Sequence, residues 1–303
     1  MHAFWWIGFT VGIIILLILD LGLFNRRTHE IKMKEAFLWS AFWIALSLGF
    51  NVFIYYEYGH EAAFQFLAAY FIEKSLSVDN LFVFVMIFSY FKIPAKYQHK
   101  VLFWGILGAM IMRLAFIYAG VELINTLHWI TYFFGFLLLY SSYKMFGDKT
   151  QEMDFDNNRI ILFIRRNFPV TRKLYGNRFI VKISGHRHIT PLLVTLIFIE
   201  LSDVIFAVDS IPAVLSISRD TFIIYSSNIL AILGLRSLYF ALKSMIDKFR
   251  YLHYGLAIIL GFVGIKMLMS DLYHIPITFS LLFILFILAL FVIISIKNPE
   301  SEE

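Results

Sequence analysis

Long apolar segments dominate this chain and restrict the folds that are open to it. A helix that crosses a bilayer needs about 20 apolar residues, because each residue adds about 1.5 Å. Of the 303 residues, 60% are hydrophobic and only 16% are charged, which is unlike the composition of a soluble domain. We therefore predict an all-α membrane protein with about nine transmembrane helices. The expected segments are 4–24, 37–56, 62–91, 100–122, 127–146, 190–218, 222–243, 251–269 and 277–296.

The basic residues predict how these segments are oriented. Lys and Arg follow the first, third, fifth and seventh segments, whereas the alternate loops carry only Arg219. Cytoplasmic loops carry such an excess of positive charge. We therefore place the N-terminus outside and the C-terminus in the cytoplasm, and we read segment 4–24 as a retained span rather than a cleaved signal. The same distribution accounts for the net charge of +5 without nucleic acid as a partner.

Two similar acidic motifs lie near the middle of the third and sixth segments. The first reads Glu-Lys-Ser-Leu-Ser-Val-Asp-Asn, and the second reads Glu-Leu-Ser-Asp-Val-Ile-Phe-Ala-Val-Asp-Ser. A charged carboxylate near the bilayer centre costs at least ~2.5–3.5 kcal/mol, so such residues are usually functional. We predict a site that both motifs share. Its candidate residues are Glu73, Asp79, Asn80, Glu200, Asp203, Asp209 and Ser210.

The similarity between the two motifs extends to the segments that follow them. An arginine comes next in each case, Arg113 and then Arg236, followed by a Tyr and a Lys twelve residues apart. Segments 3–5 and 6–8 therefore resemble two copies of one three-helix unit, and an odd number of spans inverts the second copy, as in many secondary transporters. The expected units are 1–61, two N-terminal helices; 62–146, the first repeat; 147–189, a basic cytoplasmic loop; 190–269, the second repeat; and 270–303, the last helix with an acidic tail.

The ligand types indicate a hard divalent cation. The motifs offer carboxylates, a carboxamide and a hydroxyl, and the chain has no cysteine, which excludes disulfides and thiolate metal sites. Five acids against Lys74, Arg113 and Arg236 leave a charge of −2, which one divalent cation would neutralise. The alternative is that some Arg–acid pairs only lock helices together, and we expect this for one or two of them. A purely structural role does not explain all of these Arg–acid pairs, since apolar packing would stabilise the bundle at lower free-energy cost.

Helix geometry indicates an interruption in the motif helices. On a straight helix Glu73, Ser77 and Asn80 share a face, whereas Asp79 lies about 120° away, and the same holds for Asp209 relative to Asp203. Gathering all the carboxylates then requires rotated faces or a local break. We expect a break in the sixth segment, because Pro212 cannot donate to the carbonyl of residue 208.

The region 147–189 is the only sizeable hydrophilic part. Residues 160–166 resemble a short amphipathic helix, and residues 179–183 before Gly185 favour a small strand and turn. The simpler reading is a solvated linker near anionic lipid. Metal binding there has weak support from Asp154, Asp156, His186 and His188. We expect Asp20 to reach interfacial water, and Lys144 and Lys266 to extend towards the membrane surface.

At these motifs the chain resembles the bacterial TerC/Alx family of integral membrane proteins, over nearly its whole length. The family was named for tellurium resistance, and the resemblance implies a manganese exporter in the inner membrane, with the motif acids and Asn80 handling the metal. The residues alone lead only to transport of a hard divalent cation, with protons as the candidate counter-ion. The alternative is a membrane scaffold, pH sensor or metal chaperone without autonomous transport. An enzyme is disfavoured, because no convincing nucleophile–base pair or cofactor motif is present.

Overall fold

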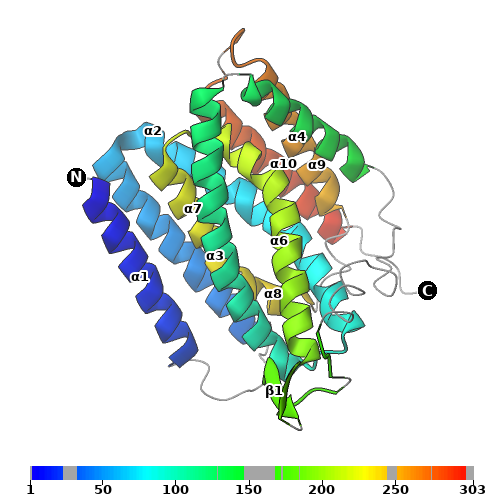
Figure 1. The fold of residues 1–303 in the computed structure, drawn as a ribbon. Coiled ribbons are helices and arrows are strands. Elements are labelled where there is room, and N and C mark those ends of the chain that lie inside the picture. Colours follow the sequence, from blue (N-terminus) through cyan, green and yellow to red (C-terminus); the bar gives the residue numbers. More distant parts are fainter. Residues whose placement is uncertain are drawn as a thin grey trace.

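Helices make up most of the structure, a computed structural model that describes residues 2–22, 33–127, 129–146, 168–171, 173–183, 185–243, 251–273 and 275–297 (Figure 1). Its helices are α1 (His2–Gly22), α2 (Met33–Tyr90), α3 (Ala95–Thr126), α4 (Ile130–Phe146), α6 (Pro191–Leu215), α7 (Thr221–Leu233), α8 (Leu235–Lys243), α9 (Leu252–Leu268) and α10 (Ile277–Lys297). Two strands, β1 (Ile180–Ile183) and β2 (His186–Ile189), complete the described elements.

Five helical stretches in the described residues are long and apolar enough to cross a membrane. They are Lys34–Ser77, Ala95–Thr126, Pro191–Leu215, Thr221–Ala241 and Ile277–Lys297, and shorter apolar helices span Phe4–Ile18 and Leu252–Leu268. Many large hydrophobic side chains on these helices are exposed, among them Leu38, Ile111 and Leu282. Such an apolar outer surface suits lipid rather than water. The structure is therefore that of a helical, multi-pass membrane protein.

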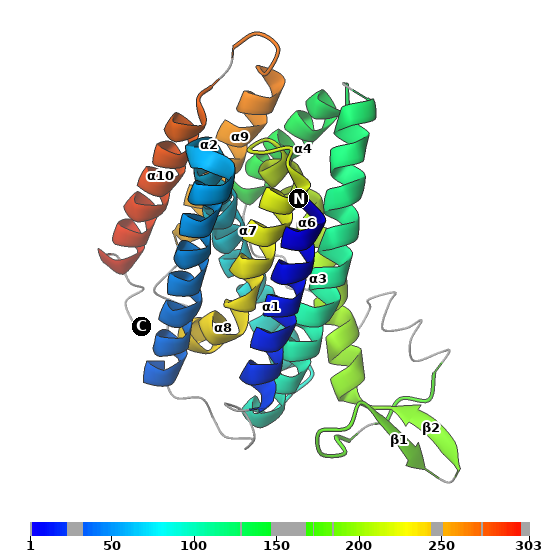
Figure 2. The ribbon, with the colours of Figure 1, turned by 90° about the vertical axis from the view of Figure 1, so that its left-hand side faces the viewer.

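The long helix α2 contains a break that reverses the chain. Gly59 has φ 88° and ψ 174°, a conformation that side chains with a Cβ rarely adopt. The two halves of α2 run back from this point towards the same end of the bundle (Figures 1 and 2). They correspond to the predicted segments 37–56 and 62–91, with the turn where the sequence predicted a loop.

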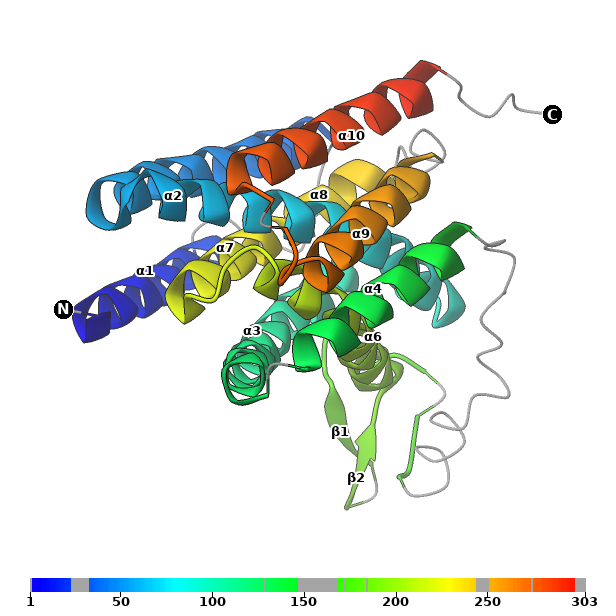
Figure 3. The same cartoon turned by 90° about the horizontal axis from the view of Figure 1, so that it is seen from above.

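The bundle is built around α2, α6 and α7. Close packing joins α4 to α9, α2 to α7 and α3 to α6, while α10 lies against α2 and α9 (Figure 3). Nearly every residue of α7 is buried, and Asp220 caps this helix by accepting hydrogen bonds from the amides of Phe222 and Ile223. On the outside, α1 packs aromatic side chains against its neighbours, with Trp5 4.7 Å from Phe53 and Trp6 5.4 Å from Phe222 between ring centroids.

The expected interruption of the sixth segment is absent. Helix α6 continues unbroken from Pro191 to Leu215 although it contains Pro212. The proline lacks only its own N–H, so it removes a single hydrogen bond, and it stands near the C-terminal end of the helix, where a kink would displace little of the chain. Residues 75–77 of α2 are helical too, and the only non-helical backbone inside α2 is at Gly59. The prediction of a break beside Asp209 was therefore wrong, and the acids of α6 point to different faces of one continuous helix.

A β-hairpin at one end of the bundle adds a small non-helical element to the predicted all-α fold. Strands β1 and β2 pair antiparallel around Gly185, whose φ is 86°. The hairpin joins the bundle at α3, because Lys100 donates to the carbonyl of Asn177 at 2.5 Å and lies 4.6 Å from the Phe179 ring centre. The predicted strand and turn are thus present, whereas the expected helix at 160–166, with Asp154 and Asp156, lies outside the described residues.

Candidate functional site

A completely buried arginine lies at the centre of the bundle. Arg113 is near the middle of α3, and its side chain has no exposed surface. Its Nε donates to Asp203 Oδ2 at 3.2 Å and its Nη2 to Oδ1 at 2.9 Å. This two-pronged contact uses the planar fork of guanidinium against the two oxygens of a carboxylate. It joins α3 to α6.

Glu73 from α2 and Asn228 from α7 complete the network. Arg113 Nη1 donates to Glu73 Oε1 and, at 3.0 Å, to Asn228 Oδ1. The amide nitrogen of Asn228 in turn donates to Glu73 Oε2 at 2.9 Å. Four helices therefore meet in one closed hydrogen-bond network. We refer to Glu73, Arg113, Asp203 and Asn228 as the buried ion network.

The buried ion network carries two carboxylates for one guanidinium. Arginine keeps its charge in proteins, so the network has a charge of −1 when both acids are ionised. Next to Glu73 along the chain, Lys74 is directed elsewhere, since its Nζ donates to the carbonyl of Ala231 at 3.1 Å. A Cβ at Gly234 would lie 2.6 Å from that nitrogen, so the glycine between α7 and α8 leaves room for it. Lys74 thus provides a hydrogen-bond donor for a backbone carbonyl in the last turn of α7.

Two further acids of α6 lie outside the buried ion network. Asp209 is half-buried, and the Ser141 hydroxyl of α4 donates to its Oδ1 at 2.6 Å. Glu200 is also partly exposed and packs against α3, where a Cβ at Gly108 would lie 2.1 Å from its Oε1. The acids of the second motif therefore face three different neighbours: Arg113, Ser141 and Gly108.

The remaining predicted residues are also near the bundle interior. Asn80 and Ser210 are buried, and within the described part of the chain the Ser210 hydroxyl has no hydrogen-bond partner. Arg236 of α8 is buried as well. The side chain of Asp79 lies outside the part that the structure describes. Among the side chains that it does describe, no group of three or more His, Cys, Asp or Glu is close enough to hold a metal ion.

Three residues of this region were not identified as site residues from the sequence. Asn228 closes the buried ion network, Ser141 holds Asp209, and Gly108 makes room for Glu200. An amide in the middle of the apolar segment 222–243 was a visible signal for Asn228. Ser141 and Gly108 are common residue types in membrane helices, so the sequence offered no comparable signal for them.

Comparisons with known proteins assign the chain to a family. The model of the integral membrane protein TerC family matches residues 58–303. The chain belongs to the TerC family. A Salmonella typhi relative named "Putative membrane-bound redox modulator Alx" is 45% identical, covering 91% of this chain and 88% of its own. A Myxococcus xanthus membrane protein, STKORF319, is 45% identical over 89% of this chain and 85% of its own. No solved structure matches.

Both acidic motifs fall inside the region that the TerC family model covers. A Rickettsia felis membrane protein extends the similarity to 96% of this chain and 97% of its own, at 41% identity. The resemblance seen in the motifs is therefore confirmed at the level of the family.

Proposed function

We propose that this protein is a secondary transporter that exports a hard divalent cation through carboxylates inside the membrane, with Mn²⁺ as the cation that the family resemblance implies. The observation that carries the proposal is the buried ion network, in which Glu73 and Asp203 from two helices share one arginine. Buried ionisable groups between transmembrane helices are costly and typically mark an ion pathway. Purely structural cross-linking would be served as well by apolar packing.

The proposed cation site combines both acidic motifs. Asp79 and Asp209 would supply charged oxygens, Asn80 and Ser210 neutral ones, and Glu73, Asp203 and Glu200 would join as the helices move. Such oxygen ligands suit Mn²⁺, Mg²⁺ and Ca²⁺. The hydroxyl of buried Ser210, next to Asp209, has no hydrogen-bond partner among the described residues, which supports this assignment because buried hydroxyls normally have one. Lys74, Arg113 and Arg236 would balance the acids when no cation is bound.

We further propose that nine spans contain two inverted repeats, at 62–146 and 190–269. Reciprocal packing supports this idea: the motif helix α2 contacts α7 of the other unit, and the motif helix α6 contacts α3. The corresponding third helices, α4 and α9, contact each other. A two-fold relation between the units would produce such exchanged contacts. Rocking of one unit against the other would then switch access to the site.

Export from a bacterial cytoplasm through the inner membrane needs an energy source. Moving a divalent cation outward against ~100 mV costs about 4.6 kcal/mol, since each charge is worth ~2.3 kcal/mol. We propose proton antiport, with Glu73 or Glu200 taking protons from outside as the cation leaves. An exchange of two protons per cation would be electroneutral, whereas a larger ratio would also use the potential.

A second candidate is a membrane scaffold, pH sensor or metal chaperone, in which the acids are structural. The Alx relatives are named as redox modulators rather than as transporters, which is a reason to keep this non-transport class as a candidate. The present sequence contains no cysteine, so a redox role could not use thiols of this chain. Autonomous transport therefore separates the two candidates.

The test is cation flux in proteoliposomes that contain only this protein. Mn²⁺, Ca²⁺, Mg²⁺ and Zn²⁺ are compared under an imposed pH gradient, with a pH-sensitive dye reporting opposing proton movement. We expect Mn²⁺ flux that falls when the gradient is collapsed. Asp209→Ala and Asp79→Asn should abolish it while the protein still folds, and Glu122→Gln, at an exposed acid of α3, is the matched control.

Each component of the proposal has its own refuting result. Absence of flux for every cation would favour the scaffold or chaperone. Mn²⁺ movement without opposing protons, unchanged by the gradient, would exclude antiport. Normal Mn²⁺ flux in Asp209→Ala would exclude the shared carboxylate site.

A further inference from the structure

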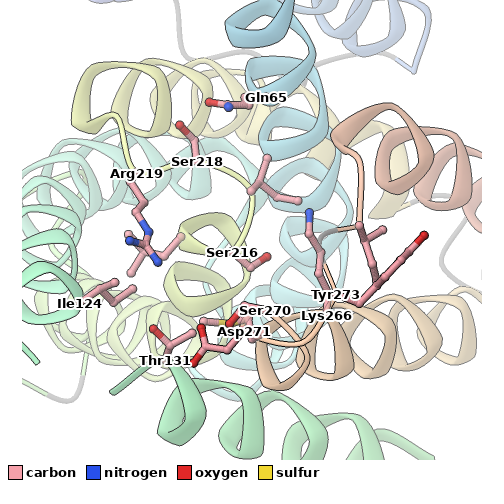
Figure 4. Close-up of a pocket in the computed structure, with 14 residues that line it drawn as sticks. Gln65, Ile124, Thr131, Ser216, Ser218, Arg219, Lys266, Ser270, Asp271 and Tyr273 are labelled. Carbon is pink, nitrogen blue, oxygen red and sulfur yellow. The ribbon is translucent and has the colours of Figure 1, made fainter. Parts of the chain in front are cut away.

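A polar cavity opens at the end of the bundle opposite the β-hairpin, away from the buried ion network. Its volume is about 410 Å³, and it lies among the ends of α3, α4, α6 and α9 (Figure 4). The turn that follows α6 and the loop that follows α9 supply most of its polar groups. The lining used in the argument is Ser216, Ser218, Arg219, Lys266, Ser270 and Asp271.

Two cationic side chains approach this cavity from opposite sides. Arg219 extends from the turn after α6, and Lys266 from the last turn of α9 (Figure 4). The ammonium of Lys266 donates to the Ser280 hydroxyl at 3.0 Å, which uses one of its three hydrogens. Within the described residues neither cation forms a salt bridge. Both therefore have hydrogen-bond donors available for a ligand.

Among the described residues that line the cavity, a single carboxylate is present, and it is already engaged. Asp271 accepts a hydrogen bond from the Tyr132 hydroxyl of α4 at 2.5 Å. This contact holds the acid at the α4 side of the cavity (Figure 4). Hydroxyls of Ser218 and Ser270 add neutral groups that can donate, whereas the Ser216 hydroxyl already donates to the carbonyl of Ala213 at 2.7 Å. The lining therefore has a surplus of positive charge and of donors.

We infer that this cavity binds an oxyanion, a phosphate group, between Arg219 and Lys266. A guanidinium donates two parallel hydrogen bonds to such a group, and an ammonium adds a compact charge. The volume lies within the range of small-molecule sites, which is about 300–1,000 Å³. A divalent cation is disfavoured there, because it would face two positive side chains. The inference is independent of the proposed cation transport.

The oxyanion could be a free solute or the phosphate of a lipid headgroup. Two arms of one binding experiment distinguish them, using the full chain purified in an uncharged detergent at low ionic strength. Inorganic phosphate is titrated by calorimetry in the first arm. In the second, phosphatidylglycerol is titrated as mixed micelles, with phosphatidylcholine as the matched neutral lipid.

Three substitutions test the geometry. Arg219→Gln and Lys266→Met should each weaken binding about tenfold, which corresponds to the ~1.4 kcal/mol expected of one lost charge-assisted hydrogen bond. Asp271→Asn should strengthen binding several-fold, because it removes the opposing charge. Lys182→Gln, at an exposed residue of the hairpin, is the charge-matched control and should change nothing. Arg219 is itself exposed, so its variant should fold even if Lys266→Met does not.

Binding in either arm with this pattern of variants supports the site and identifies its source. The inference is overturned if neither phosphate nor phosphatidylglycerol binds, or if Arg219→Gln leaves the binding affinity unchanged. It is equally overturned if Asp271→Asn weakens binding, or if Mn²⁺ binds the cavity and loses affinity on that substitution.

Discussion

Removal of Arg113 is the most direct perturbation of the buried ion network. Arg113→Ala eliminates four hydrogen bonds, two to Asp203, one to Glu73 and one to Asn228. It also leaves two carboxylates facing each other in a water-poor interior. Both effects destabilise the folded state when no cation is present.

The expected loss is large. Breaking a buried ion pair by removing one partner costs about 3–5 kcal/mol, because the other charge stays buried. At 2–4 °C per kcal/mol, as for domains of 150–250 residues, this lowers the melting temperature by roughly 10 °C. Arg113→Lys should lose less, since a lysine restores the charge although not the two-pronged contact with Asp203.

A bound cation should offset this loss if Arg113 is the counter-charge of the proposed site. Mn²⁺ could then neutralise Glu73 and Asp203 in place of the guanidinium. A cation at 100 times its dissociation constant stabilises a protein by about 2.7 kcal/mol. Because Mn²⁺ need not displace an arginine in Arg113→Ala, it should raise the melting temperature of this variant more than that of the parent.

The assay is thermal unfolding in detergent, followed by intrinsic tryptophan fluorescence at one fixed scan rate with and without Mn²⁺. The control variant combines Arg113→Met, Glu73→Gln and Asp203→Asn, which removes all the charges of the network together. It should recover much of the stability, because neutral replacements of a buried ion pair are often tolerated. Equal destabilisation of the metal-free and metal-loaded forms by Arg113→Ala would refute the counter-charge assignment.

Two further predictions concern the other acids of α6. Gly108→Ala should reduce cation flux several-fold with little change in stability, because a Cβ there would displace the mobile end of Glu200, while Gly49→Ala, which meets no atom within 4 Å, is the control for the flux assay. Ser141→Ala should weaken Mn²⁺ binding less than Asp209→Ala does, since it removes one hydrogen bond to Asp209, worth ~1 kcal/mol, but keeps the carboxylate. A titration of Mn²⁺ on both variants checks the order, and unchanged affinity in Asp209→Ala would remove the basis of this prediction.

Hydrophobicity and turn chemistry predicted most of the helical architecture. The segment 190–218 corresponds to α6, and the reversal near 57–61 occurs at Gly59, where the backbone conformation requires glycine. The hairpin around Gly185 followed from a short β-rich stretch before a glycine. These features are set locally, by residues within one turn or one segment, and a single sequence displays them.

The contacts within the site were harder to predict from the sequence. The 120° separation of Asp203 and Asp209 followed from helix geometry, and the structure places them against different helices. Which helix each acid meets depends on packing between segments far apart in the chain, such as α6 with α3 or α4. The expected break at Pro212 is absent, because one proline removes a single hydrogen bond and the rest of the helix α6 stays intact.

In the proposed export cycle the cation must be bound and also released, and the position of Arg113 suits both steps. In the present arrangement both oxygens of Glu73 and of Asp203 accept hydrogen bonds, so a cation would have to compete with the guanidinium for them. The cost of breaking that contact is subtracted from the binding free energy of the cation, which keeps affinity moderate. Return of the guanidinium would in turn favour release. On this reasoning an internal counter-charge makes the two costly buried acids Glu73 and Asp203 compatible with the proposed turnover.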